Sequence, residues 1–163
     1  MKRREFIVTS SILGASTVLN SQEFKADNTL SWLIIDNVFD ILFPKTKTMP
    51  SAKEFNATSY LQINSKYKSF DMDDREYILQ GALDFNDSFP NFLKSTQEQK
   101  ENIIERTNNS EYGQEWLTRL VYYGIEAMLS DPIYGGNKNE IAWKSLNHQT
   151  GRPQPKYKYA KVV

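Results

Sequence analysis

Residues 110–128, SEYGQEWLTRLVYYGIEAM, decide the fold of this 163-residue chain. Their apolar side chains recur every three or four positions, which is the spacing of one face of an α-helix. This face consists of Trp116, Leu117, Leu120, Val121, Gly124, Ala127 and Met128. Ser110 is of a residue type favoured at helix N-caps. We therefore predict a long helix that begins after Ser110 and forms the centre of the core.

Helical signals continue on the N-terminal side of this segment. The predicted helices run from a cap at Asp27 or Asn28 to Pro44, from a capping box at Ser51–Glu54 to about Leu61, from a cap at Asp71 or Asp73 to about Pro90, and from a capping box at Ser95–Glu98 to Asn108. Period-two alternation is limited to residues 157–159, so we predict no strand. We expect an all-α fold, in which residues 27–150 form a single helical bundle and residues 151–163 an extended or mobile tail.

Residues 1–26 have the three parts of a targeting peptide. A basic start contains Arg3, Arg4 and Phe6, an apolar run over residues 7–19 follows, and polar residues end the segment. This order looks like a twin-arginine signal, which exports proteins that are already folded. The apolar run is roughly 13 residues long, whereas about 20 are needed to span a bilayer, so we expect no permanent transmembrane helix. The alternative is a basic N-terminus that precedes a short helix by chance.

The composition argues against several functions for this chain acting alone. Its 20 Lys and Arg balance its 20 Asp and Glu, so a basic face for nucleic acid is not indicated. The absence of cysteine rules out disulfides, thiolate metal sites and C-x-x-C-H haem attachment. No G-x-G-x-x-G loop follows a strand to hold a dinucleotide. We therefore expect no catalytic residue and no cofactor or metal site in this chain.

The densest run of special residues is DPIYGGN at 131–137. Pro132 lacks a backbone N–H and should end the long helix. The two glycines permit positive φ and a close approach of the backbone. Asn137 can cap a short helix that should carry Trp143, and Tyr134 would then lie at a loop tip with its ring free. A tight loop whose aromatic rings fold back on the core is an equally simple interpretation.

Together these features resemble the gluconate 2-dehydrogenase subunit 3 family. Members combine a twin-arginine leader, here residues 3–6, with a first helix that ends in a Leu-Phe-Pro-like stop, here residues 42–44. Near the C-terminus they carry D-P-x-Y-G-G-N followed by W-K, here residues 131–137 and 143–144. The resemblance covers nearly the whole chain. It departs over residues 145–153, where the family usually has a glycine and a short Pro-Gly turn.

The resemblance implies a noncatalytic small subunit of a periplasmic gluconate 2-dehydrogenase complex. The large subunit would carry FAD and oxidise gluconate to 2-ketogluconate, and a cytochrome c subunit would pass electrons on through haem c. The small subunit would supply the signal read by the twin-arginine translocase, stabilise the large subunit, and associate with the inner membrane through the complex. Docking to the partner would use Tyr134, Gly135, Gly136, Asn137, Trp143 and Lys144. The alternative function is a free-standing periplasmic adaptor or ligand-binding helical module.

Other candidate residues favour structural roles. His148 is the only histidine and lies among polar neighbours, so we expect a structural or solvent-exposed role. Asp36 and Asp40 lie one helical turn apart on the predicted polar face, which is typical of a solvated surface rather than a catalytic pair. The Lys-Tyr tail at 156–161 could wrap a partner, touch anionic lipid, or simply be a frayed terminus. We predict no site there.

Overall fold

The computed structural model describes residues 28–150 of the chain. The predicted export signal with Arg3, Arg4 and Phe6 and the predicted tail at 151–163 lie outside the described residues. Six α-helices form the described part: α1 (Asn28–Leu42), α2 (Ala57–Asn64), α3 (Met72–Ser88), α4 (Gln97–Asn108), α5 (Glu111–Leu129) and α6 (Ile141–Ser145). Short 3-10 turns lie at η2 (Phe92–Lys94), η3 (Pro132–Tyr134) and η4 (Lys138–Glu140). Because the described residues contain no strand, the all-α prediction is confirmed.

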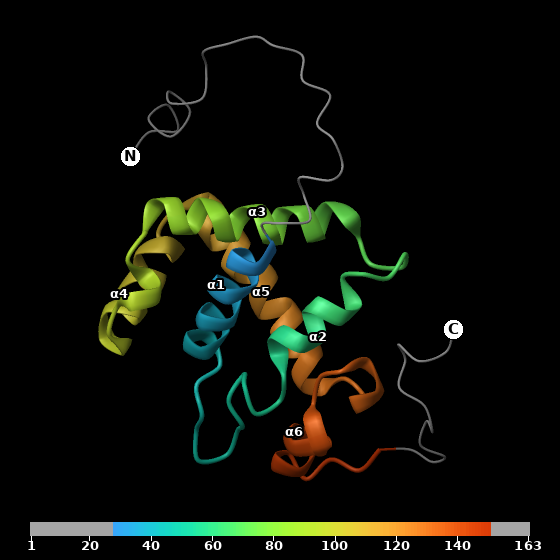
Figure 1. The fold of residues 1–163 in the computed structure, drawn as a ribbon. Helices are drawn as coiled ribbons and strands as arrows, with labels where there is room; N and C mark the ends of the chain where they lie inside the picture. The colour runs from blue at the N-terminus through green and yellow to red at the C-terminus, as the bar shows by residue number, and fades with distance from the viewer. Residues whose placement is uncertain (1–27, 151–163) are drawn as a thin grey trace.

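The long helix α5 is the centre of the domain, as its sequence predicts. It contacts α1, α2, α3, α4 and α6. In Figure 1, α3 crosses the top of the molecule, α5 runs behind α1 and α2, and α6 lies below them. Trp116 is 1% exposed, and its indole N–H donates a 3.1 Å hydrogen bond to the carbonyl of Ile78 in α3. Burying a polar N–H requires such a partner, so this bond fixes how α3 lies on α5.

The core is rich in aromatic rings. The largest fully buried side chains include Trp116, Phe39, Phe55 and Phe92. Tyr123 is also buried, although it was not part of the predicted apolar face. Its hydroxyl donates a 2.7 Å hydrogen bond to Asp74 at the start of α3, which gives the polar end of the ring a partner.

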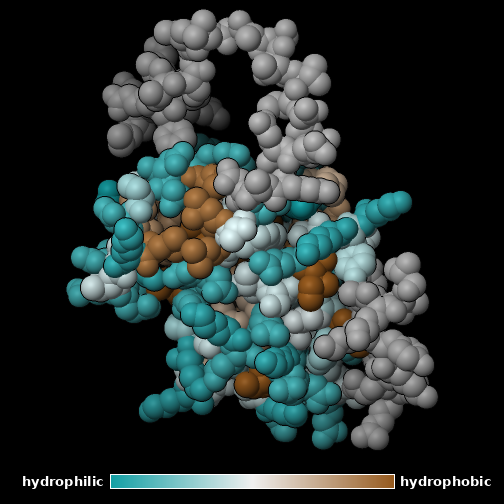
Figure 2. All heavy atoms as spheres, viewed as in Figure 1, coloured by the Kyte–Doolittle hydropathy of each residue, from teal (hydrophilic) through white to brown (hydrophobic). Residues whose placement is uncertain are grey.

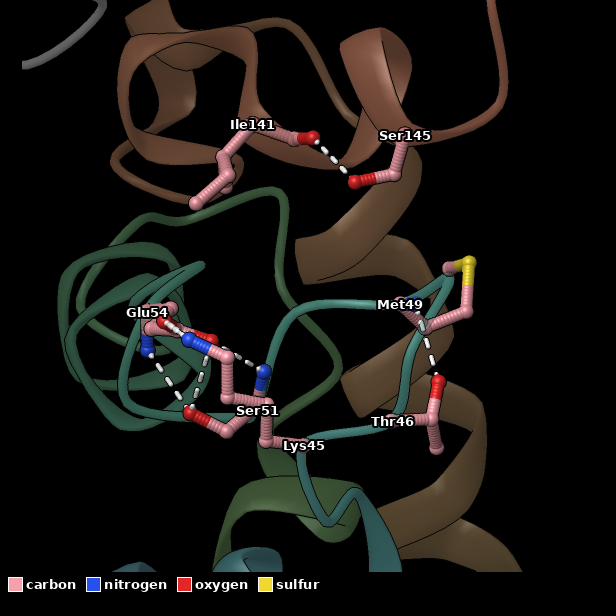
Figure 3. A network of polar contacts seen from close by, with 7 residues as sticks. All are labelled: Lys45, Thr46, Met49, Ser51, Glu54, Ile141 and Ser145. Atoms are coloured by element: carbon pink, nitrogen blue, oxygen red, sulfur yellow. Dashed lines mark hydrogen bonds and ion pairs between the residues drawn. The ribbon is translucent and has the colours of Figure 1, made fainter.

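The second predicted helix begins later than its capping signal suggests. The Glu54 carboxylate accepts hydrogen bonds from the backbone N–H of Ser51 at 2.8 Å and from its hydroxyl at 3.3 Å, and Lys45 pairs with the same carboxylate (Figure 3). The predicted pairing of Ser51 with Glu54 therefore forms. However, Asn56 adopts a left-handed conformation with φ of 60°, which interrupts the turn. The α-helix starts at Ala57, so the prediction of a helix from Ser51 is wrong by one to two turns.

The start of α4 also differs by one residue. The capping box consists of Thr96 and Gln99, whereas the prediction used Ser95 and Glu98. Ser95 instead closes the preceding turn, because its backbone N–H donates to the carbonyl of Phe92 and its hydroxyl to that of Asn91. The predicted caps at Asp71 and Ser110 are confirmed: the side chain of Asp71 accepts from two backbone N–H groups, and that of Ser110 accepts from Gly113.

The surface is largely polar. The largest hydrophobic area in Figure 2 lies over the part of the molecule where Figure 1 places α1, α3 and α4, and smaller hydrophobic areas lie elsewhere on this face. On α5, by contrast, apolar side chains are exposed along one side: Tyr122 is 55% exposed, Ile125 42% and Leu129 45%. That side of α5 borders the candidate site.

Candidate docking site at the C-terminal end of α5

The 131–137 segment closes the end of α5 through a buried asparagine. Asn137 has no exposed surface. Its Nδ2 donates a 3.1 Å hydrogen bond to the carbonyl of Ser130, and its Oδ1 accepts a 3.0 Å bond from the backbone N–H of Ala142. Helix ends leave their last carbonyls and first N–H groups without helical partners. One side chain therefore serves the end of α5 and the start of α6 together.

Trp143 provides a second contact of the same kind. Its indole N–H donates a 2.9 Å hydrogen bond to the carbonyl of Leu129, and the residue is 8% exposed. The prediction that a short helix carries Trp143 is confirmed. The His148 ring lies edge-on to the indole of Trp143, with centroids 5.8 Å apart. The backbone N–H of His148 donates a hydrogen bond to the backbone carbonyl of Trp143. His148 thus contacts the domain through Trp143.

Asn137 does not cap the short helix in the usual position. The turn η4 separates it from α6, whose N-cap is Glu140. Asn137 reaches over this turn because its own backbone is left-handed, with φ of 40°. Asparagine adopts this conformation more readily than most residues, since its side chain can hydrogen-bond locally. Asn137 therefore satisfies a backbone N–H at the start of α6, as predicted, but it lies farther before the helix than an N-cap residue does.

The two glycines meet different requirements. Gly135 has φ of 95°, a conformation that residues with a side chain rarely adopt. At Gly136 a Cβ atom would lie 2.3 Å from the carbonyl oxygen of Ala127, so the loop can lie on α5 only without a side chain there. The loop is thereby pressed against the helix that it terminates.

Tyr134 and Lys144 keep accessible surface. Tyr134 is half-buried rather than standing free at a loop tip, and its backbone carbonyl accepts a 2.9 Å hydrogen bond from Asn64 of α2. Lys144 is exposed, and its Nζ lies 2.7 Å from the carbonyl of Asn139 and 3.8 Å from the carboxylate of Glu140. Of the six residues predicted to dock a partner, these two are the ones whose side chains reach the surface.

A groove of about 590 Å³ lies between α2, α5 and the 131–134 turn. We call it the tyrosine groove, because its walls include Tyr60, Tyr67, Tyr122 and Tyr134, together with Phe70. Only Tyr134 belongs to the predicted site. The other rings come from three separate segments, and none of them belongs to a sequence motif. Their convergence follows from the packing of α2 and the 67–70 loop beside α5.

Carboxylates set the charge of the tyrosine groove. Glu126 and Asp131 are its charged lining residues. The Tyr60 hydroxyl lies 3.3 Å from Glu126, and burial, reinforced by that carboxylate, raises the pKa of Tyr60 far above its ordinary value. Tyrosine is neutral at physiological pH even without this shift, so the two carboxylates give the groove its negative charge.

A second hollow of about 860 Å³ continues along α5 and shares Tyr122 with the groove. Asp73, Asp74 and Glu115 line it, together with Arg119. Arg119 donates a 3.1 Å hydrogen bond to Asp74. Asp73 and Asp74 lie in the first turn of α3, and Asp74 also joins α3 to α5 through Tyr123.

The remaining acidic candidates have structural partners. The Asp36 carboxylate accepts a 2.6 Å hydrogen bond from the Thr58 hydroxyl of α2, and Asp40 pairs with Lys53. Between residues 28 and 150, no group of three or more acidic, histidine or cysteine side chains is arranged to hold a metal ion. Over the same residues, no helix combines the length and the apolar character needed to cross a membrane.

These features define a small all-α domain whose most specialised segment closes a helix end and borders a negatively charged, aromatic groove. A family model described as gluconate 2-dehydrogenase subunit 3 matches residues 30–151. The chain belongs to the gluconate 2-dehydrogenase subunit 3 family, and its role is that of a subunit in such a complex. The comparisons found no matching curated protein and no matching solved structure.

Proposed function

We propose that this chain is the noncatalytic small subunit of a periplasmic gluconate 2-dehydrogenase complex, in which partner subunits carry FAD and haem c. The observation that carries the proposal is the family match over residues 30–151. Two sequence features support it: without cysteine the chain cannot attach haem c, and it has no Gly-rich loop for a dinucleotide. The oxidation of gluconate and the onward electron transfer would then occur in the partner subunits.

The charge of the tyrosine groove also bears on this division of labour. Gluconate and 2-ketogluconate are anions, and the groove is lined by Glu126 and Asp131 without a lysine or arginine among its lining residues. Like charges repel most strongly where water is partly excluded. The groove is therefore poorly suited to the substrate or product, which argues against a gluconate-binding module and supports a substrate site in the large subunit.

Within the docking segment, Gly135 forms the turn through its positive φ, and the contacts divide the other five predicted residues into two groups. Gly136, Asn137 and Trp143 are buried in the domain, where they hold the 131–144 segment on α5. We propose that they act on docking through the shape of the loop. Tyr134 and Lys144, which keep accessible surface, would contact the large subunit directly. Tyrosine is enriched in protein interfaces, and the rims of interfaces are polar, so Tyr134 suits the centre of a contact and Lys144 its rim.

We further propose that Arg3, Arg4 and Phe6 form the twin-arginine signal and export the bound flavoprotein with this chain to the periplasm. The test is a tagged full-length chain coexpressed with its flavoprotein partner. With Arg3→Lys and Arg4→Lys, which keep the charge, we expect the flavoprotein to accumulate in the cytoplasm. The control is Lys2→Arg, a neighbouring basic exchange that should leave export intact.

Two outcomes would contradict the proposal. A flavoprotein without a signal of its own that still reaches the periplasm with the double-lysine variant would refute the export role. Isolation of the chain from its native envelope without flavin absorbance and without a large partner would refute the subunit role, and it would favour the free-standing adaptor.

A further inference from the structure

We propose that the tyrosine groove and the acidic hollow beside it bind the chain's own C-terminal segment, residues 152–161. The proposal does not depend on the function proposed above. It rests on the chemistry of the groove, the sequence of the segment, and the place where the described chain ends.

The receiving surface is continuous and negatively charged. Tyr122 belongs to both hollows, so they form one surface along the exposed side of α5. Five carboxylates line this surface: Asp73, Asp74, Glu115, Glu126 and Asp131. Arg119 is the one cation among these lining residues, and it is already bonded to Asp74. The surface therefore has carboxylates that a basic partner could approach.

The same surface has an apolar wall on α5 that a partner could cover. Tyr122, Ile125 and Leu129 are each between 42% and 55% exposed and lie one helical turn apart on α5. Contiguous apolar surface of this kind is unfavourable in water and marks binding sites. A fitting occupant would combine rings or aliphatic chains with positive charge.

Residues 152–161, RPQPKYKYAK, have this composition. The segment contains Arg152 and three lysines, no acidic residue, and tyrosines at 157 and 159. Tyrosine rings can pack edge-to-face on other rings, and lysine lays its aliphatic stem along apolar surface while its charge stays in water. This one chain thus contains both an acidic, aromatic groove and a basic segment with tyrosines that could fill it.

The last described residues are connected to the groove by contacts. The described chain ends at Thr150, two residues after His148, which lies against Trp143. Trp143 in turn is bonded to the carbonyl of Leu129, a residue of the groove wall. Thirteen residues at up to about 3.3 Å each reach roughly 40 Å, whereas Tyr122 and Leu129 are about 10 Å apart along α5. The tail is therefore long enough to lie along the groove.

Because the chain has no cysteine, a single introduced thiol can report on the groove. In the full chain, Ile125→Cys places a thiol in the groove wall, and its alkylation by iodoacetamide is timed. We expect Lys156→Glu, Lys158→Glu and Lys161→Glu together to speed alkylation by roughly tenfold, about the sum of three exposed ion pairs. A circular dichroism melting curve of each variant shows whether the domain stays folded. The control is Leu33→Cys on α1, which is 49% exposed and should react equally with either tail.

Charge exchange makes the test specific. Combining the triple-glutamate tail with Glu115→Lys and Glu126→Lys should restore the slow reaction of Cys at position 125, because the signs on both sides are reversed. Raising the salt to about 1 M should abolish the protection of the wild-type tail, since the screening length falls to about 3 Å. Equal alkylation rates with both tails would overturn the proposal. So would protection that rises with protein concentration alongside a doubled mass, because a second copy would then be the occupant.

Discussion

Asn137 offers the sharpest test of how the 131–144 segment is built, because each of its polar side-chain atoms has one backbone partner. Asn137→Gly removes both hydrogen bonds while allowing the left-handed backbone. Asn137→Ala removes the same bonds and also places a Cβ atom at φ of 40°. Comparing the two variants separates the hydrogen bonds from the backbone conformation.

The magnitude follows from the groups left behind. The carbonyl of Ser130 and the N–H of Ala142 would each lose the partner that they have at 3.1 and 3.0 Å. A buried group without a partner costs about 1–3 kcal/mol, and water entering the space left by the side chain offsets part of this. We expect Asn137→Gly to lower the free energy of unfolding by about 3 kcal/mol. Asn137→Ala should cost about 1 kcal/mol more, because alanine adopts the left-handed conformation less readily.

Urea and thermal unfolding of the full chain, followed by circular dichroism, measures these values. A loss of about 3 kcal/mol corresponds to a melting temperature lower by roughly 10–15 °C for a domain of this size. The matched control is Asn139, which is exposed and also left-handed, with φ of 58°. Asn139→Gly should change the free energy of unfolding by less than about 0.5 kcal/mol. If the glycine variants at 137 and 139 have equal stability, the bridging role of Asn137 is refuted.

Three further predictions concern the same end of α5 and two tyrosines, one in α2 and one in α5. Gly136→Ala should destabilise the domain by about 1–3 kcal/mol in the same unfolding assay, since the new Cβ would lie 2.3 Å from the Ala127 carbonyl oxygen; unchanged stability would show that the loop does not press on α5. Burial first, and the bonded carboxylate second, raise the pKa of Tyr60 and of Tyr123, so the folded state holds these two protons to higher pH than the unfolded state does. The contribution of these two tyrosines to stability should be constant below about pH 10 and then fall by up to about 2.7 kcal/mol per pH unit, and Tyr112, whose pKa is also raised by burial, should add to the fall. The fall should be shallower in Tyr123→Phe, and a stability that rises above pH 10 would contradict the assignment. Lys144→Ala should leave the melting temperature within about 2 °C, because its ion pair is exposed, yet it should reduce copurification of the flavoprotein; an undiminished yield would remove Lys144 from the interface.

The helices could be predicted because their apolar residues recur with helical periodicity. The residue at which each helix begins could not always be predicted. The apolar face of α5 and the caps at Asp71 and Ser110 involve residues within one or two turns, so local sequence contains the whole signal. The late start of α2 depends on the left-handed backbone conformation of Asn56, and the Ser51–Glu54 pair forms in spite of this conformation. A capping signature therefore fixes a turn, but it does not ensure that a helix continues from that turn.

The groove was beyond sequence reasoning for a different reason. Tyr60 and Tyr122 lie in different helices, and nothing in the local sequence of either residue indicates a binding site. The packing of α2 on α5 brings the two rings together, and no local sequence pattern predicts which helices pack against each other. The acidic character of the groove was hidden likewise, because the chain as a whole is neutral and the carboxylates come from α3, α5 and the 131 turn.

The structure also changes what the 131–137 segment says about docking. Gly136 and Asn137 are distinctive in sequence because the closure of α5 requires them, and both are buried. A distinctive residue is therefore not by itself a contact residue. Variants of Asn137 should lose stability and docking together, whereas variants of Lys144 should lose docking alone. A loss of docking in Asn137→Gly with unchanged stability would show that a partner reaches this side chain, and that the loop opens in the complex.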